Sequence, residues 1–426
     1  MAVTEEAIRV KPTLNIVIVG HVDHGKSTLV GRLLHDTGSL PDGKYDAVAR
    51  VCEETGKAFE FAFLLDALEE ERDQGITIDN AQIRFETDQR TYAIIDAPGH
   101  KEFLKNMVTG ASSADAALLL IDADEGVQEQ SRRHGYILHL LGIRQVAVVI
   151  NKLDLVGYSR EVFENVRNTY LSFLRELGIT PQFVIPLSAR EGDNVASGSE
   201  RMPWYDGPTV LQALDLFEAK VSKDHAPLRM PVQDVYKFDQ RRIIAGRVES
   251  GTLREGDTVV FSPSGRKNVV KSIERWQSVR NGDAVAGESV GITLEEQAFV
   301  ERGEIVSHEQ SPPKSTSILH TNLFWLGDRA LMVGGKYLLK LTTQEVECVV
   351  SAIGGVMNTA TLQRNEKARE VAKNEVATVV FDMKKPVAFD SATEVVETGR
   401  FVIVDGFDTA GGGIIPKSDF PQSYQI

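Results

Sequence analysis

The chain has 426 residues, of which 42 % are hydrophobic and 25 % are charged, and its formal net charge is −14 at pH 7. This length predicts two or three domains rather than one core, and this composition is typical of a globular protein. The acid excess disfavours nonspecific nucleic-acid binding by the whole surface. The chain contains no run of eighteen or more apolar residues, which argues against a membrane-spanning helix.

The N-terminal segment and the cysteines indicate a cellular compartment. Residues 1–15 contain acids and no apolar segment, so they do not form a secretory signal. Only Cys52 and Cys348 are present, in unrelated segments, which excludes a disulfide scaffold and a paired-cysteine metal site. We therefore expect a cytoplasmic protein.

The first predicted strand leads through a glycine-rich loop into a helix. Residues 14–19 (LNIVIV) are a continuous, β-branched apolar run, typical of a buried strand in a parallel sheet. Residues 27–38 place apolar side chains at helical spacing and end at a glycine. The loop between them, GHVDHGKS, fits the pattern of a phosphate-binding loop.

Each residue type in this loop suits a phosphate chain. Gly20 and Gly25 allow the backbone to approach an anion, and the helix N-terminus adds partial positive charge. Lys26 supplies a cation for the β- and γ-phosphates, and the Ser27 hydroxyl can ligate Mg²⁺. The predicted nucleotide-binding residues of this segment are Gly20, His21, Val22, Asp23, His24, Gly25, Lys26, Ser27 and Thr28.

A long insertion follows between Asp36 and Gly75. Residues 43–56 and 59–75 both have helical spacing, and the second segment is rich in acids. Two interpretations remain open: a solvated helical hairpin, or a lever that carries the nucleotide state to a partner.

Another apolar strand, beginning at Thr91, ends in the sequence Asp96-Ala-Pro-Gly99. An acid at the carboxyl end of a parallel strand can hold Mg²⁺ through water. The backbone N–H of Gly99 can approach the γ-phosphate. A common turn is the alternative explanation of this short motif.

The strand at residues 146–151 ends in Asn151-Lys-Leu-Asp154. An ionised carboxylate only accepts hydrogen bonds, and guanine offers it two donors on one edge, the ring N1–H and the exocyclic amine. Adenine offers no such pair, so Asp154 is predicted to select guanine. The Lys152 stem can cover the base.

A further strand beginning at Phe183 ends at Ser188-Ala189-Arg190. Ser188 and Ala189 are predicted to present backbone N–H groups to the guanine oxygen, and Arg190 belongs to the same candidate site. A solvated loop is the alternative for each of these two strand ends.

Strand patterns dominate the remainder of the chain. Residues 222–231 are polar, contain two prolines and predict a linker. Short strands with recurring turn signals follow on both sides of a second break at residues 311–315. The predicted architecture is an α/β phosphate-loop GTPase domain at residues 1–221, followed by β-barrel domains at residues 222–311 and 312–426.

These motifs together resemble the translational GTPase superfamily. The resemblance rests on GHVDHGKST, ERDQGITID, DAPGHKEFLKNMVTGA, NKLD and SAR. It implies GTP and GDP as ligands, with Mg²⁺ held by Ser27, Thr77 and Asp96. It also implies that His100 orients the attacking water, that Lys26 and Thr77 act with it in catalysis, and that Val22 and Ile76 form an apolar gate before His100.

The third domain is similar to one branch of the superfamily. KYLLKL at residues 336–341 and GRFVIVDGFDTAGGGII at residues 399–415 look like the GTPase subunit of bacterial sulfate adenylyltransferase. This resemblance implies that the chain couples GTP hydrolysis to the synthesis of adenylyl sulfate and pyrophosphate from ATP and sulfate. The implied partner is the small catalytic subunit of that enzyme, and no membrane is expected to take part.

The alternative is a factor like elongation factor 1 alpha that delivers aminoacyl-tRNA to the ribosome. Such a carrier needs a basic surface facing RNA. Acids such as Asp234 and Glu274 are interspersed among the candidates, which predicts an ordinary solvated sheet face and no nucleic-acid partner. The candidate basic residues are Lys237, Arg241, Arg242, Arg266, Lys267, Lys271 and Arg275.

Overall fold

The computed structural model describes residues 13–73, 83–95, 114–140, 142–218, 226–238, 241–275, 282–359, 361 and 363–417. The chain forms two compact units. One comprises residues 1–139 and 143–220, and the other comprises residues 140–142 and 221–426. Both predicted barrels lie in the second unit.

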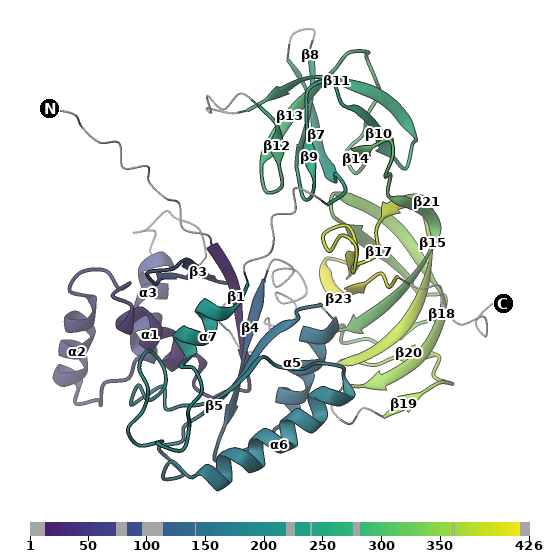
Figure 1. Ribbon diagram of the computed structural model, residues 1–426. Coiled ribbons are helices and arrows are strands. Elements are labelled where there is room, and N and C mark those ends of the chain that lie inside the picture. The colour runs from purple at the N-terminus through teal and green to yellow at the C-terminus, as the bar shows by residue number, and fades with distance from the viewer. Residues whose placement is uncertain are drawn as a thin grey trace, which may run out of the picture. The chain divides into compact units, whose positions relative to one another are not determined.

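The first unit is built on a six-stranded sheet with the order β2-β3-β1-β4-β5-β6 (Figure 1). All neighbouring strands are parallel except the edge pair β2–β3. The chain therefore leaves β1, β4, β5 and β6 at the same edge of the sheet, where ligands bind in open α/β folds. The strands are β1 (Thr13–Gly20), β2 (Ile83–Glu86), β3 (Thr91–Ile94), β4 (Ala116–Asp122), β5 (Gln145–Asn151) and β6 (Phe183–Pro186).

Helices cover both faces of this sheet, with α5 and α6 on the side opposite α1 and α7 (Figure 1). Apolar side chains of α1, α3 and α7 share one core with the strands, and Tyr170 of α6 is buried against α5. Side chains cap two helices, because Ser159 accepts from the Val162 N–H and Thr209 forms a capping box. The helices are α1 (Lys26–Asp36), α2 (Lys44–Thr55), α3 (Ala62–Asp73), α5 (Glu129–Leu140), α6 (Arg160–Glu176) and α7 (Val210–Leu216).

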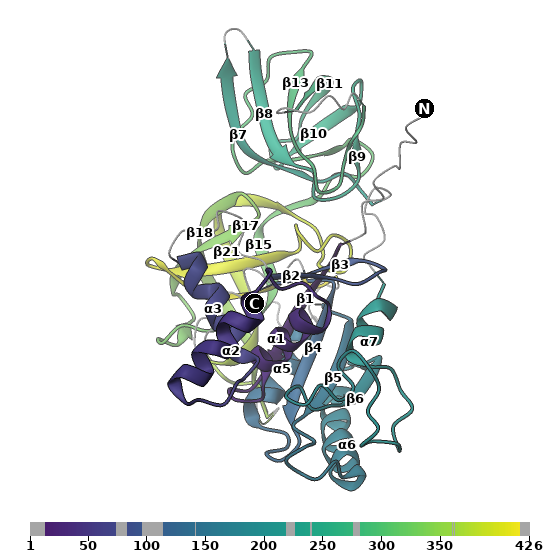
Figure 2. The ribbon, with the colours of Figure 1, turned by 90° about the vertical axis from the view of Figure 1, so that its left-hand side faces the viewer.

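The first barrel of the second unit is closed, with the strand order β10-β11-β13-β8-β7-β14 (Figure 2). Strand β14 closes it by pairing antiparallel with both β10 and β7. The interior is filled by alternate apolar side chains of these strands, as expected for a small barrel. The strands are β7 (Met230–Phe238), β8 (Arg241–Arg247), β9 (Thr252–Leu253), β10 (Thr258–Ser262), β11 (Arg266–Glu274), β12 (Ala284–Val285), β13 (Ser289–Leu294) and β14 (Ile305–His308).

The second barrel has the order β17-β22-β23-β15-β21-β18-β19, and the pairing of β17 with β18 closes it. Trp325 and Phe381 are fully buried in its core. The strands are β15 (Lys314–Trp325), β16 (Leu331–Met332), β17 (Lys336–Leu341), β18 (Gln344–Asn358), β19 (Arg364–Asn365), β20 (Glu370–Val371), β21 (Glu375–Phe389), β22 (Arg400–Asp405) and β23 (Asp408–Ile414).

A buried ion pair joins the two barrels. The Arg229 guanidinium, in the segment before β7, donates from Nε and from one terminal nitrogen to the two carboxylate oxygens of Asp390, each at 2.7 Å. Its other terminal nitrogen donates to the carbonyl oxygens of Leu228 and Ser311. Asp390 also accepts from the Thr398 hydroxyl at 2.6 Å. Both charged groups are almost fully buried and hydrogen-bonded, so they hold the two barrels together within one unit.

The predicted fold class is confirmed: an α/β phosphate-loop domain precedes two β-barrels. Strand β4 was not predicted from the sequence, although its run AALLLID is continuous, apolar and ends in an acid. Both predicted helices of the insertion are present as α2 and α3. Among the described residues, no helix is both long and apolar enough to cross a membrane.

Candidate functional site

A cavity of about 620 Å³ opens at the edge of the sheet where β1, β5 and β6 end. Three predicted motifs meet there: the loop between β1 and α1, the loop after β5 and the loop after β6. The predicted residues that line the cavity are Gly20, Val22, Asp23, Gly25, Lys26, Ser27, Thr28, Asn151, Lys152, Asp154, Ala189 and Arg190.

The phosphate loop is shaped by close backbone contacts. Gly25 has φ +87°, and a Cβ added there would lie 2.4 Å from the Asn151 side-chain nitrogen. A Cβ at Gly20 would lie 2.8 Å from the Leu120 carbonyl oxygen of β4. Only glycine fits both positions, so the loop can curl at the start of α1, where unpaired helix N–H groups attract anions. Ser27 and Thr28 belong to this first turn and line the cavity.

Lys26 spans the phosphate loop from its end to its start. Its ammonium donates to the carbonyl oxygens of Gly20 at 2.9 Å and His21 at 2.7 Å. Burial lowers the pKa of Lys26 to about 8, and the negative charge of Asp23 offsets part of this effect. No carboxylate of the described residues is ion-paired with Lys26, so this cation is set to attract an anionic ligand.

The side chains of the two histidines of the loop contact other parts of the protein. The His24 side chain is fully buried beneath the loop, and Nδ1 donates to the Leu120 carbonyl oxygen at 3.2 Å. Burial lowers the pKa of His24, and Nε2 lies 3.4 Å from the Glu125 carboxylate. His21 contacts Gln130 through Nδ1 at 2.6 Å. Neither residue lines the cavity, so their side chains brace the loop rather than face a nucleotide.

Asn151 ties the phosphate loop to the loop after β6. Its side-chain amide donates to the His24 carbonyl oxygen and accepts from the Ala189 N–H, both at 2.9 Å. Lys152 has φ +63°, and its ammonium lies 2.6 Å from the Asp122 carboxylate at the end of β4. The Lys152 stem therefore lies along the cavity wall with its charge fixed, as required to cover a flat ligand.

Asp154 is the acceptor predicted to select guanine. It lines the cavity and is partly exposed. Among the described residues, no cation or donor is paired with its carboxylate. Both oxygens can therefore accept from a ligand without breaking a contact of the protein.

The roles predicted for the backbone N–H groups of Ser188 and Ala189 differ from the observed ones. The Ser188 N–H donates to the Asp193 carbonyl oxygen at 3.3 Å, and the Ala189 N–H donates to Asn151. Ser188 does not line the cavity, whereas Ala189 and Arg190 do. These N–H groups shape the loop, because a tight turn needs internal hydrogen bonds that the sequence pattern does not show.

Several lining residues were not predicted from the sequence. Phe59 and Phe61, at the start of the second half of the insertion, line the cavity beside the phosphate loop. Burial and the nearby charge of Lys26 lower the pKa of His134, on α5, to about 3, so this imidazole is neutral. The alternation of aromatic residues at 59–61 was the available signal for the insertion. His134 carried none, because it lies on a helix distant in sequence.

Some predicted site residues cannot be compared with the structure. Thr77, Asp96, Gly99 and His100 lie outside the described residues, as does Ile76 of the predicted gate. Ser27 is the predicted Mg²⁺ ligand within the described ranges, and these ranges contain no group of three His, Cys, Asp or Glu suited to a metal. The magnesium site therefore stays a prediction.

Together, the glycine-shaped loop at a helix N-terminus, the partly buried lysine and the available carboxylate define a phosphate-loop domain that binds a nucleotide. Three family models match the chain. They are the elongation factor Tu GTP binding domain over residues 11–223, elongation factor Tu domain 2 over residues 241–306, and the GTP-eEF1A C-terminal domain-like family over residues 319–416. The chain belongs to the translational GTPase family, and it is a GTP-binding protein of the GTPase class.

Curated relatives match almost the whole chain. The sulfate adenylyltransferase subunit 1 of Laribacter hongkongensis is 40 % identical over 419 residues, covering 96 % of this chain and 86 % of the relative. The elongation factor 1-alpha of Thermoplasma acidophilum is 39 % identical over 417 residues, covering 95 % and 97 %. A solved structure of Sup35 complexed with GDP is 24 % identical, covers 97 % of both chains and has a TM-score of 0.44.

Proposed function

We propose that this chain is the GTPase subunit of a sulfate adenylyltransferase. In this role it acts with a small catalytic subunit that joins ATP and sulfate to give adenylyl sulfate and pyrophosphate. That reaction is strongly uphill, and hydrolysis of GTP to GDP and phosphate drives it. The two nucleotide states must bind different conformers of the partner with different affinity, because otherwise no free energy is transferred.

The residues divide the GTPase work. Lys26 and the first turn of α1 hold the phosphates, and Asp154 selects guanine. Family resemblance gives Ser27, Thr77 and Asp96 the role of holding Mg²⁺, and it gives His100 the role of orienting water. Bound Mg²⁺ would neutralise charge on the phosphates.

The charge pattern of the first barrel is the observation that favours this function over tRNA delivery. Four of the seven candidate RNA-binding cations contact other groups of the barrel, and two of these four are ion-paired: Lys267 lies 2.5 Å from Glu309, and Arg275 lies 3.1 Å from Glu288. Arg266 donates to the Phe299 carbonyl oxygen, and Arg242 stacks at 4.8 Å from the Phe299 ring. An ion-paired cation releases fewer counterions from a polyanion than a free one, so the pairing of Lys267 and Arg275 favours a function other than RNA binding.

The third domain supports the same choice. Its two segments that resemble the sulfate enzyme form β17 and the β22–β23 hairpin, which are consecutive in the sheet. A Cβ at Gly413 would lie 1.9 Å from the Asn322 carbonyl oxygen, and one at Gly411 would lie 2.8 Å from the Trp325 ring. The glycine run of β23 is therefore needed for β15 and Trp325 to pack closely. The two segments that resemble the sulfate enzyme are therefore parts of one packed region of the third domain.

Delivery of aminoacyl-tRNA is the second candidate, and the 39 % identity to elongation factor 1-alpha favours it. The observation that would support it is a tRNA affinity that falls steeply with salt, as expected where many phosphates are contacted. A shallow dependence supports sulfate activation.

The test is to isolate the chain with its native partner and to measure pyrophosphate release from ATP and sulfate. With the wild-type chain, we expect pyrophosphate release to require GTP. With the Asp154→Asn variant, we expect pyrophosphate release to be supported better by xanthosine triphosphate than by GTP, because the variant changes the base preference. This switch ties the coupling to this cavity. Loss of both dependences, or a complex without sulfate-dependent release, contradicts the proposal.

A further inference from the structure

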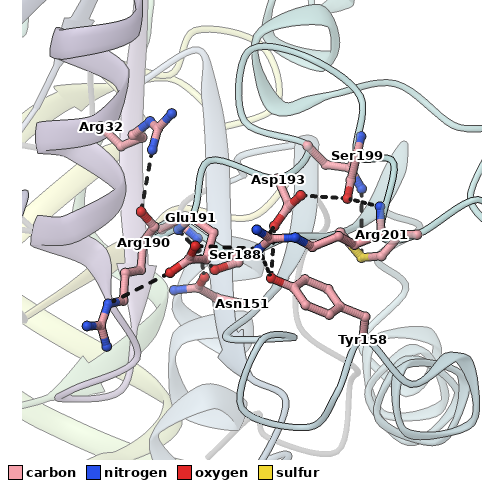
Figure 3. A network of polar contacts seen from close by, with 12 residues as sticks. Arg32, Asn151, Tyr158, Ser188, Arg190, Glu191, Asp193, Ser199 and Arg201 are labelled. Atoms are coloured by element: carbon pink, nitrogen blue, oxygen red, sulfur yellow. Dashed lines mark hydrogen bonds and ion pairs between the residues drawn. The ribbon is translucent and has the colours of Figure 1, made fainter.

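Two cavity loops are joined to a third segment that contains no recognised motif. The Asp154 loop runs from Asn151 to Ser159, and the loop after β6 runs from residue 187 to residue 193. The third segment, residues 194–208, continues from the second loop to α7. Figure 3 shows side chains of all three segments converging in one network of polar contacts.

The Tyr158 hydroxyl is the centre of this network. It donates to the Asp193 carboxylate at 3.0 Å and accepts from the Arg201 guanidinium at 2.6 Å. The Ser199 hydroxyl donates to the other Asp193 oxygen at 2.6 Å. A single phenol therefore links a residue of each cavity loop with the third segment (Figure 3).

Arg201 reaches more than one partner. Its guanidinium lies 3.4 Å from the carboxylates of both Glu191 and Asp193, and 5.4 Å from the centre of the Tyr158 ring. Glu191 lines the cavity next to Arg190. The position of Arg201 thus restrains the part of the second loop that faces the ligand.

The backbone of the Asp154 loop needs such restraint. Tyr158 has φ +57°, an uncommon conformation for a residue with a large side chain, and it follows Gly157 at φ +63°. The Tyr158 N–H donates to the Leu153 carbonyl oxygen at 2.7 Å, and the Trp204 indole donates to the Tyr158 carbonyl oxygen at 3.2 Å. The left-handed turn is therefore fixed from its backbone and from its side chain.

We propose that Tyr158, Asp193 and Arg201 form a clamp that positions Asp154 for recognition of the guanine amine. None of the three lines the cavity, whereas Asp154, Ala189 and Glu191 do. They are positioning residues, because they act through the loops that carry the contacts. The inference rests on guanine-nucleotide binding and is independent of sulfate activation.

Tyr158→Phe is the sharpest test, because it removes one hydroxyl and keeps the ring. Arg201 is half-exposed, so the substitution leaves no isolated buried charge. Affinities of the full-length protein for GDP and inosine diphosphate are measured side by side. Inosine lacks the exocyclic amine and keeps the ring N1–H, so the ratio of the two affinities reports recognition of the amine by Asp154.

We expect Tyr158→Phe to lower GDP affinity about three- to tenfold, the range of one hydrogen bond, with a smaller loss for inosine diphosphate. The ratio should therefore shrink. The matched control is Tyr205→Phe, since the Tyr205 hydroxyl donates to the Pro208 carbonyl oxygen at 2.9 Å and Tyr205 does not line the cavity. Arg201→Lys keeps the charge, so it should keep part of the preference for GDP over inosine diphosphate. Arg201→Ala should lose this preference.

A purely structural role would lower the fraction of active protein without moving the ratio. An unchanged ratio in Tyr158→Phe, or an equal change in Tyr205→Phe, therefore overturns the clamp. If the wild-type chain holds GDP and inosine diphosphate equally, guanine selection by Asp154 is wrong and the clamp is overturned with it. Thermal unfolding of each nucleotide-free variant identifies any variant that fails to fold, and for such a position the Arg201→Lys and Arg201→Ala pair decides.

Discussion

The nucleotide cavity and the joint between the barrels each contain a cation and a carboxylate, but the two charges are paired with each other only at the joint. At the joint, Arg229 and Asp390 satisfy each other through two hydrogen bonds of 2.7 Å. In the cavity, Lys26 reaches only backbone carbonyl oxygens among the described residues, and Asp154 has no partner there. Burial consequently lowers the pKa of Lys26 to about 8.

The difference indicates where a ligand belongs. A buried charge costs free energy unless another charge or several hydrogen bonds compensate it. The joint is compensated by the protein itself, so it contributes to structure. In the cavity, Lys26 and Asp154 are partly buried and have no charged partner among the described residues, so they remain available to an anion and to the donors of a ligand.

Asp390→Ala should have the largest effect, because it leaves the Arg229 guanidinium buried without its counter-charge. We expect the second unit to lose about 3–5 kcal/mol of its free energy of unfolding. Calorimetry can separate the units, since GDP should raise the transition of the first unit only.

The matched control replaces both partners, Arg229→Met with Asp390→Leu. It should recover most of the stability, because two apolar side chains of similar volume remove the buried charge altogether. Equal losses in the single and the double variant would show that the joint depends on shape rather than on charge compensation.

Asp154→Asn tests the carboxylate that has no partner among the described residues, and it should have an intermediate effect. The amide still accepts one hydrogen bond but loses the charge, so GDP affinity should fall by about 1.5–3 kcal/mol. Xanthosine diphosphate, which has an oxygen in place of the guanine amine, should gain relative to GDP, as titration calorimetry would show.

The same substitution should leave the unfolding of the nucleotide-free protein almost unchanged, because no group of the described residues is paired with the Asp154 carboxylate. A clear loss of stability without nucleotide would mean that this carboxylate serves the fold. The contrast with Asp390 would then disappear.

The local pattern of the sequence was sufficient to predict loops that line the cavity. Apolar strands followed by GHVDHGKS and NKLD place Lys26 and Asp154 at one edge of a parallel sheet, and both line the cavity. The turn signals also predicted two β-barrels, which the structure contains.

Interactions between distant segments could not be predicted in this way. His24 matches the loop motif, yet it is buried against β4, because a pattern of residue types does not show which way a side chain points. The Arg229–Asp390 pair joins residues 161 positions apart. Arg201 of the clamp lies in a segment without a motif, and only the fold brings it to Tyr158.

The smallest effect that we expect is a change of GDP affinity with pH. It tests directly whether the Lys26 ammonium lacks a charged partner in the free protein. In the free protein the pKa of Lys26 is about 8, because burial disfavours the charged form. Nucleotide phosphates favour that form, so the pKa of Lys26 rises in the complex. Well below pH 8 the ammonium is charged in both states, so Lys26 adds no pH dependence to the affinity. Above pH 8 binding must take up a proton, and GDP affinity should fall by up to about 1.4 kcal/mol per pH unit.

Titration calorimetry in buffers of different ionisation heat would measure this proton uptake. Lys26→Arg provides the control, since a guanidinium stays protonated over the whole range and leaves only the titration of the nucleotide itself. An equal pH slope in the wild type and in Lys26→Arg would mean that Lys26 is already fully charged in the free protein. The charge of Lys26 would then be stabilised by the protein itself, as the charge of Arg229 is at the joint. The two regions would no longer differ in how they treat their cation.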